Sequence, residues 1–435
     1  MNEGADINIP PTGDISRLAE HLFRHEAGKL VSVLTSIFGL ERLQLAEDVV
    51  QEALLRALQT WPYYGVPQKP AAWLTQTAKN LALDVLRREK TFRDKQPAIT
   101  LTMERDAATD LPAFEHEIRD ERLRMMFACC HPVIPHEAQV ALALKTLCGF
   151  SSGEIARAFL TSEAAIEKRL VRARQRIREE RVAFEIPAGE ELAQRLDAVL
   201  QTLYLLFNEG YKASSGDKLI REELCDEAIR LTTLLVEHPA GNYPKTHALL
   251  ALMLLNAARL PARVDDEGNM LRLKEQDRSV WSQPKIARGM FHLSQAASGS
   301  ELTEYHLQAG IAACHCSAPD YESTDWPQIL SLYDRLIYLD DSAIIALNRA
   351  VAVAQVHGPA VGLQAVAGIK NRKSLNGYYL LYAVLADFEA QLKDFESAAD
   401  HLRKALELTE LKSEHSFLSR RLQECEVARN GKQSA

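Results

Sequence analysis

Apolar residues recur every three or four positions along most of the chain, which is the spacing of amphipathic helices. One such pattern over residues 45–58 places polar residues such as Glu47 and Asp48 between the apolar ones, and it predicts a helix ending at Trp61 and Pro62. Another over 73–86 predicts a helix starting near Pro70, because proline fits a first turn. Apart from one short hairpin expected near 265–268, the pattern predicts helices throughout, and therefore an all-α fold.

Two interruptions divide this helical pattern. Periodicity is lost from about 96 to 112, where Thr, Asp, Ala and two prolines predict an extended linker, and Pro187-Ala188-Gly189 marks a second boundary. The predicted organisation is a flexible N-terminus (1–15), a first helical domain (16–95), a linker (96–116), a second helical domain (117–185) and a C-terminal helical domain (186–435).

The C-terminal domain contains helical hairpin repeats. In 379–408, small and large residues alternate around a turn at Lys393 and Asp394, which is typical of a tetratricopeptide repeat. A weaker copy covers 344–366, with its turn at 357–359. We therefore expect an α-helical repeat domain, a class whose concave surfaces suit protein partners.

Residues 150–178 carry the strongest local motif. Ser151 and Ser152 can cap one helix, and Thr161 and Ser162 can cap a second, which together predict a helix-turn-helix. The turn position often occupied by glycine is Leu160, which costs roughly 1–2 kcal/mol if it is left-handed. The second helix has polar residues at its start and no acidic residue among the cations that follow: Lys168, Arg169, Arg172, Arg174, Arg176 and Arg178. This pattern fits a recognition helix on DNA, although a solvated basic face on an ordinary hairpin is the alternative.

A second cationic group ends the helix that begins near Pro70: Lys79, Arg87, Arg88, Lys90, Arg93 and Lys95. Aromatic residues precede it, namely Trp61, Tyr63, Tyr64 and Trp73. Proteins that bind single strands use such a combination to stack bases and follow the backbone. Taken alone, core tryptophans and a basic helix end explain it better.

Composition limits the function classes. The 435 residues carry a net charge of −8, with −1 in residues 1–186 (25 Lys+Arg, 26 Asp+Glu) and −7 in 187–435 (26 and 33), so acidity belongs mainly to the C-terminal part. Seven cysteines, an odd number, favour a reducing cytoplasm over a disulfide framework. Glu3, Asp6 and two prolines do not fit a signal peptide, and the longest apolar run, 248–255, is too short for a membrane span.

Candidate metal and catalytic motifs do not hold. Cys129-Cys130-His131 and Cys314-His315-Cys316 lack zinc-ligand spacing, so we expect buried small residues there. The segment 265–269 has its glycine in the wrong place for a calcium loop, and glycine-rich nucleotide motifs and the nucleophile elbow are missing. We expect no catalytic residue, no metal and no cofactor, and therefore no enzyme.

Residues 16–184 resemble an extracytoplasmic-function (ECF) sigma factor of bacterial RNA polymerase. Residues 46–58 (AEDVVQEALLRAL) resemble region 2.2, residues 70–89 resemble regions 2.3 and 2.4, and the helix-turn-helix resembles region 4.2. The remainder is similar to the C-terminal extension of the ECF42 subgroup. The segments that carry this similarity are LFNEGY (206–211), LCDEAIRL (224–231), QDRSVW (276–281), TDWPQILSLYDRL (324–336) and LNRAVAVA (347–354).

The resemblance implies roles for particular residues. Region 2.2 would contact the β′ clamp helices of core RNA polymerase through Asp48, Gln51 and Glu52. The minus-10 element would be bound by Trp73, Lys79, Asn80, Asp84, Arg87 and Arg88. The minus-35 element would be bound by Ser162, Glu163, Glu167, Lys168, Arg169 and Arg172, with Arg174 and Arg176 on phosphates. The implied partners are core polymerase, at the clamp helices and the β flap, and promoter DNA.

The sequence therefore predicts a cytoplasmic sigma factor whose C-terminal domain acts as a built-in regulator, through contact with the sigma domains or the polymerase. One alternative is a ligand-responsive helix-turn-helix regulator that acts without polymerase. Another is an interaction scaffold that has lost DNA binding. The polar and aromatic residues of QDRSVW and TDW could line a groove for a ligand or partner, but buried ion pairs and helix caps are the commoner reason for such residues.

Overall fold

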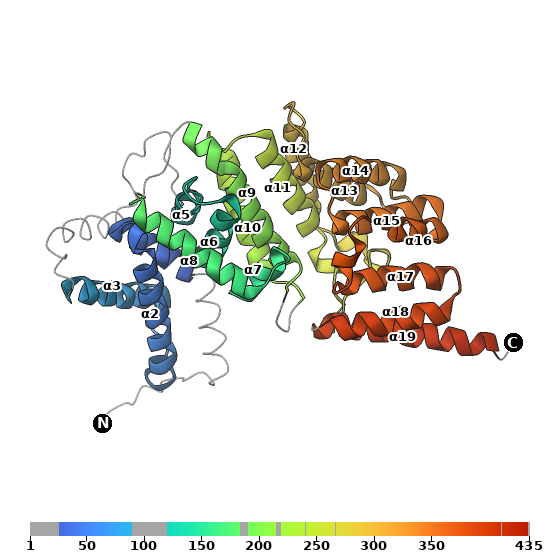
Figure 1. The fold of residues 1–435 in the computed structure, drawn as a ribbon, viewed down its shortest axis with the longest axis horizontal. Helices are drawn as coiled ribbons and strands as arrows, with labels where there is room; N and C mark the ends of the chain where they lie inside the picture. The colour runs from blue at the N-terminus through green and yellow to red at the C-terminus, as the bar shows by residue number, and fades with distance from the viewer. Residues whose placement is uncertain are drawn as a thin grey trace, which may run out of the picture. The chain divides into compact units, whose positions relative to one another are not determined.

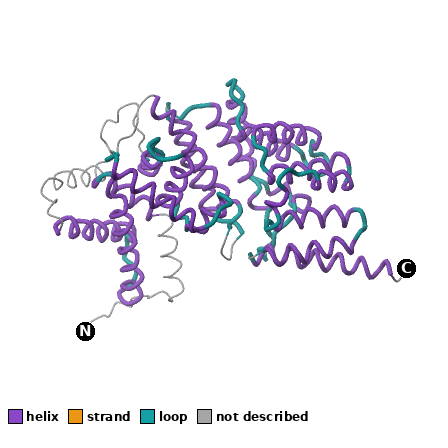
Figure 2. The backbone as a smooth tube through the Cα atoms, viewed as in Figure 1, coloured by secondary structure: helices purple, strands orange, loops and turns teal. Residues whose placement is uncertain are grey.

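The computed structural model describes residues 26–88, 120–182, 190–214, 219–239, 241–265, 267–409 and 411–433. The described residues are helical throughout, apart from turns and one isolated bridge between Val264 and Met270 (Figure 2). The predicted N-terminal segment 1–15 and linker 96–116 lie outside the described residues. The all-α prediction is confirmed for the described chain.

The chain forms two compact units, and the division falls inside one helix. Unit 1 comprises residues 1–205 with the short segment 237–241, and unit 2 comprises 206–236 and 242–435. The helix α9 (Glu190–Tyr211) begins in unit 1 and ends in unit 2. The structural boundary is thus about one helix later than the 186 expected from the sequence.

Unit 1 contains the two N-terminal helical blocks (Figure 1). Residues 26–38 are helical and lead into η1 (Leu40–Arg42), α2 (Leu43–Tyr64) and α3 (Pro70–Arg88). The second block consists of α5 (Glu121–Cys129), α6 (His136–Leu147), α7 (Ser152–Ala158) and α8 (Glu163–Glu179). The helix α2 runs past the predicted end at Trp61 and Pro62: Pro62 lies in its last turn, and Tyr64 is its last residue. The C-cap is Gly65, whose φ of 80° suits glycine.

The first half of α9 packs on the second block of unit 1. The side chain of Arg195 is buried and donates from Nη1 to the carbonyl oxygen of Phe127, 3.0 Å away. Nε2 of His136 lies 2.6 Å from Oε1 of Gln201. The helix that opens the C-terminal extension therefore also completes unit 1.

Unit 2 is a series of helices in which most helices pack against the next one along the chain. It contains α10 (Glu222–Glu237), α11 (Pro244–Ala257), α12 (Gln283–Ala296), α13 (Glu304–Ser317), α14 (Trp326–Leu339), α15 (Ala343–His357), α16 (Pro359–Ala367), α17 (Tyr379–Gln391), α18 (Phe395–Leu408) and α19 (Lys412–Gln433). Short 3-10 turns η2 to η5 connect them: Leu260–Ala262, Leu273–Glu275, Arg278–Val280 and Arg372–Leu375. Among the described helices, none has the length and hydropathy needed to cross a bilayer.

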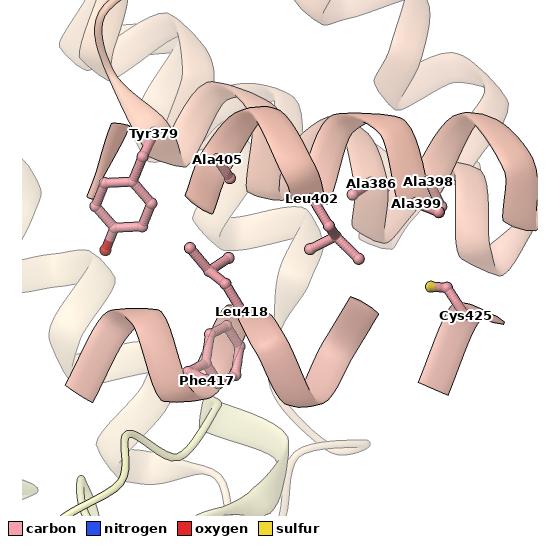
Figure 3. Close-up of a cluster of buried hydrophobic side chains, with 9 residues drawn as sticks. All are labelled: Tyr379, Ala386, Ala398, Ala399, Leu402, Ala405, Phe417, Leu418 and Cys425. Atoms are coloured by element: carbon pink, nitrogen blue, oxygen red, sulfur yellow. The ribbon is translucent and has the colours of Figure 1, made fainter. Parts of the chain in front are cut away.

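The hairpin predicted over 379–408 is present as α17 and α18. Lys393, with φ of 63°, lies in the turn between them. Alanines at the helix crossing are fully buried, and α19 closes the cluster with Phe417, Leu418 and Cys425 (Figure 3). The weaker copy is also a hairpin, formed by α15 and α16 around Gly358.

The sequence segments of unit 2 have structural roles. Arg278 donates from Nη1 to the carbonyl oxygens of His315 (2.8 Å) and Ala318 (2.7 Å), and from Nη2 to the Thr324 hydroxyl (3.0 Å). It thereby joins QDRSVW to TDW, and Asp325 caps α14 by accepting from the amide of Gln328. In these segments the structure therefore shows the expected helix cap at Asp325, together with an arginine, Arg278, that binds backbone carbonyl oxygens.

Candidate nucleic-acid interface

The helix-turn-helix is built by its caps. Ser151 and Glu154 form a reciprocal capping box at α7, and the Ser162 hydroxyl accepts from the amide of Ala165 at α8. Leu160, between the two helices, has φ of 50° and lies largely in solvent. The left-handed conformation, which the sequence left open, is therefore present, and a non-glycine residue adopts it.

One face of α8 is buried and the opposite face is exposed. Ile166, Leu170, Ala173 and Ile177 pack inward. The exposed residues include most of those expected at the minus-35 element: Ser162, Glu163, Glu167, Lys168, Arg172 and Arg176. Because these side chains share an exposed face of one helix, they can approach a major groove together.

Two of the expected DNA contacts, Arg169 and Arg174, pair with other helices, and a third, Arg176, forms an exposed ion pair with Glu180 at 2.9 Å. Arg169 pairs through Nη2 with the Glu137 carboxylate at 2.6 Å, and its guanidinium carbon lies 5.5 Å from the ring centre of Phe159. Arg174, expected on a phosphate, donates from Nη2 to both oxygens of Glu47, at 2.9 and 3.0 Å. Arg169 and Arg174 therefore need a change of partner before they can meet DNA.

The sequence pattern places Glu47 among the polar positions of its helix, but the structure shows the residue buried, with 9% of its surface exposed. Its Oε1 also accepts from the Thr146 hydroxyl at 2.7 Å, so α2 is bound to both α6 and α8. Burial also raises the pKa of the neighbouring Cys129 thiol, and the Glu47 charge adds to that effect. No local signal identifies this contact, because Glu47 and Arg174 lie 127 residues apart in sequence.

A second contact joins the same parts of unit 1. Gly28, buried in the helical segment 26–38, faces the end of α6, and a Cβ there would collide with the carbonyl oxygen of Leu147. Only glycine permits this approach of the two backbones. The two helical blocks are therefore packed together at two points of one interface.

The residues expected at the minus-10 element are divided in their exposure. Asn80, Asp84 and Arg87 are exposed on α3, whereas Lys79 is buried at 7% exposure. Trp73 is half-buried and meets the buried Trp61 edge-on, with ring centres 5.6 Å apart. Arg88 is the last residue of α3, and Lys90, Arg93 and Lys95 lie outside the described residues.

The polar face of α2 is exposed as expected. Asp48, Gln51 and Glu52 all lie in solvent; Asp48 accepts from Gln44 at 2.8 Å, and Glu52 pairs with Arg56 at 3.0 Å. Large apolar side chains of α2 are exposed as well: Leu55, Leu58, Tyr63 and Tyr64, of which the two tyrosines belong to the aromatic group noted in the sequence. A mixed acidic and apolar surface of this kind is suited to a protein partner.

Comparisons with known proteins match three successive segments of the chain. The family model of Sigma-70 region 2 matches residues 22–92, that of Sigma-70, region 4 matches 124–177, and a family of unknown function (DUF6596) matches 195–297. The chain is 38% identical over 385 residues to the uncharacterized protein R00370 of Rhizobium meliloti (strain 1021), covering 87% of this chain and 90% of that one.

A shorter match concerns a protein named probable RNA polymerase sigma factor RfaY, from Xanthomonas campestris pv. campestris. It is 32% identical over 139 residues, which are 31% of this chain and 34% of that one. No solved structure matches. The chain belongs to the same family as R00370 and, with regions 2 and 4 in order on the packed helical blocks of unit 1, is an RNA polymerase sigma factor of the extracytoplasmic-function type.

Proposed function

We propose that this sigma factor binds the β′ clamp helices through the exposed face of α2, the minus-10 element through α3 and the minus-35 element through α8. The carrying observation is the exposure of Asp48, Gln51 and Glu52 on one helix and of the minus-35 residues on another. The acidic face suits a protein partner, and the cationic face suits phosphates. A contact with the β flap belongs to the same proposal.

The packed arrangement of unit 1 corresponds to a state that does not bind both elements. Positions −35 and −10 are about 25 base pairs apart, or roughly 85 Å at 3.4 Å per base pair. In contrast, Glu47 on α2 lies 2.9 Å from Arg174 on α8, and α2 itself spans roughly 33 Å at 1.5 Å per residue. Promoter binding therefore requires α8 to leave α2, which also frees Arg174.

The built-in regulator is the second part of the proposal. Unit 2 is a helical series like those used for protein binding, and the acidic charge of residues 187–435 is opposite to that of α8. In this proposal, α15 to α18 pack as tetratricopeptide-like hairpins, and the C-terminal part of the chain is an extension of the ECF42 type. The protein is placed in the cytoplasm, where its polymerase partner is.

The test uses core RNA polymerase, the purified full chain and a promoter selected by the holoenzyme from random duplex DNA. Asp48→Lys and Glu52→Lys should each abolish co-elution with core polymerase, whereas Lys412→Glu, also exposed, should not. Retained binding in both α2 variants would contradict the assignment. Binding to DNA without any affinity for core polymerase would instead favour the ligand-responsive regulator, which the match to region 2 does not favour.

A test of the regulatory role removes unit 2 by truncating the chain at the boundary between the two units. A chain ending after Leu205 keeps the part of α9 that packs on region 4, including Arg195, whereas a chain ending after 185 removes it. We expect the chain ending at 205 to keep its helical circular dichroism and to change promoter-dependent transcription. Unchanged transcription and unchanged polymerase affinity would contradict a regulatory role for unit 2.

A further inference from the structure

A cavity of about 410 Å³ lies within unit 2, between α15, α17 and α19. Its apolar wall includes Leu380, Val384, Phe388 and Phe417. Figure 3 shows Leu402 and Leu418, which also line it, pointing toward one another from α18 and α19. A concave apolar site of this size matches the usual dimensions of small-ligand pockets.

Charged side chains line the other part of the cavity. Among the described lining residues, three are cationic and one is a carboxylate: Arg272, Lys274, Arg421 and Asp387. The Asp387 carboxylate accepts from Arg421 at 3.0 Å and from Gln391 at 2.7 Å, and Arg272 lies 3.9 Å from it. The Arg272 guanidinium is held mainly by Glu275, which accepts from its Nε at 2.8 Å, and Asp387 fixes Arg421. Among the described lining cations, Lys274 is the one that forms no ion pair.

Arg421 is the most enclosed of these cations. Its side chain is 9% exposed, and its Nε has no hydrogen-bond acceptor, although the Glu424 carboxylate lies 3.5 Å away. A buried guanidinium donor without an acceptor has a free-energy cost that an incoming anion can relieve. Burial, followed by the Asp387 charge, raises the pKa of Tyr321 in the same lining, so its hydroxyl keeps its proton and can donate.

We propose that this cavity binds a small organic anion that has an apolar body and a single carboxylate or similar acidic group. The body lies against the apolar wall, and the acidic group lies among Arg272, Lys274 and Arg421. The unsatisfied donors select this class, because an acidic group can accept from Lys274 and from the Nε of Arg421, whereas a neutral apolar ligand would leave both donors unpaired. The site belongs to unit 2 alone, and the proposal does not depend on the sigma function.

Octanoate is a suitable probe, since it has one carboxylate and an eight-carbon chain. Isothermal titration calorimetry of the full chain should show one site for octanoate and at least about tenfold weaker binding for 1-octanol and for acetate. Equal affinity for octanol would overturn the anionic part of the proposal. No binding of octanoate below 1 mM, or saturation only by a peptide with an acidic side chain, would overturn the ligand class.

Two kinds of variant locate the binding. Lys274→Gln removes an exposed charge and should weaken octanoate several-fold, and Ala383→Phe should fill the cavity and abolish binding. Lys404→Gln, an exposed cation of α18 that does not line the cavity, is the matched control and should bind as the unaltered chain does. Circular dichroism checks that each variant folds. Full binding by a folded Ala383→Phe chain would place the site elsewhere and overturn the proposal.

Discussion

The carboxylate of Glu47 and the guanidinium of Arg174 form a buried ion pair that connects the region 2 helix α2 to the region 4 helix α8. The contact distances are 2.9 and 3.0 Å, and the two side chains are 11% and 17% exposed. Removal of one member of such a pair leaves the other charge buried without a partner, which typically costs about 3–5 kcal/mol. The chain can avoid this cost by separating the two helices.

Glu47→Gln should therefore increase minus-35 binding by the free protein, by about three- to tenfold, because Arg174 becomes available to DNA. Glutamine still accepts from Thr146, so the change removes charge without leaving that hydroxyl unpaired. Fluorescence anisotropy of a labelled duplex measures the affinity. Glu180→Gln, which breaks the exposed pair with Arg176, is the control and should change affinity less than twofold. Equal affinities for the two variants would contradict the prediction.

Gly28→Ala should open the same contact without changing any charge, because the new methyl group collides with the carbonyl oxygen of Leu147. Minus-35 affinity should rise as it does for Glu47→Gln. The double variant should bind no tighter than the better single variant, since both remove one interface. Lys29→Ala, exposed on the next residue, should have no effect. Fully additive gains would show that the two contacts are independent.

Leu160→Gly should stabilise the helix-turn-helix by about 1 kcal/mol, because glycine adopts the positive φ without the cost that leucine bears. Hydrogen exchange of peptides from α7 and α8 should become slower. Leu160→Ala removes the same exposed side chain and keeps the strained backbone, so it should show no such slowing. If Leu160→Ala stabilised the helix-turn-helix as much as Leu160→Gly, the gain would come from removing the exposed leucine side chain and not from relieving the backbone.

Arg278→Lys should destabilise unit 2 by about 2–4 kcal/mol, because an ammonium cannot reach the two carbonyl oxygens and the Thr324 hydroxyl together. Urea unfolding followed by circular dichroism measures the loss. Arg335→Ala removes an exposed arginine of α14 and serves as the comparison. A lysine variant as stable as the unaltered chain would mean that the charge alone is sufficient.

The stability of unit 2 should fall as the pH falls below about 6.5. Burial, with the charges of Arg259 and Arg278, lowers the pKa of His315 to about 3, so the folded state keeps this ring neutral. The unfolded state has the ordinary pKa and binds the proton between about pH 6.5 and 3, which favours unfolding in that window. At pH 5 the loss is about 2 kcal/mol. His315→Phe should remove this part of the slope in urea titrations at pH 7 and 5, and an unchanged slope would assign it to other groups.

Local features of this fold were predictable because short-range chemistry determines them. Ser151 and Ser162 cap their helices as expected, Pro70 begins α3, and Leu160 is left-handed. The burial of Ala386 and Ala398 also follows from the spacing of small residues. The caps, the helix start and the turn depend on neighbours within about four residues, and the alanine burial depends on the adjacent helix of one hairpin.

The long-range contacts were not predictable from one sequence. The position of Glu47 beside apolar residues gives no sign of a partner on α8, and the same holds for Arg421 and Asp387, which lie on different helices. Lys79 was expected at DNA, yet it lies between Ala78 and Ala82, both fully buried, and a lysine stem can be buried along such a face. These outcomes depend on tertiary packing, which periodicity does not encode.

The helix α9 limits how region 4 and the C-terminal extension can recombine during evolution. Because its first half packs on region 4 and its second half belongs to unit 2, neither part has a complete core without the residues of 190–211. A recombination event between region 4 and the extension would split the partners Arg195 and Phe127, so the two parts are expected to be exchanged as one block during evolution. A chimera that joins this extension to another sigma factor should retain the region 4 on which α9 packs.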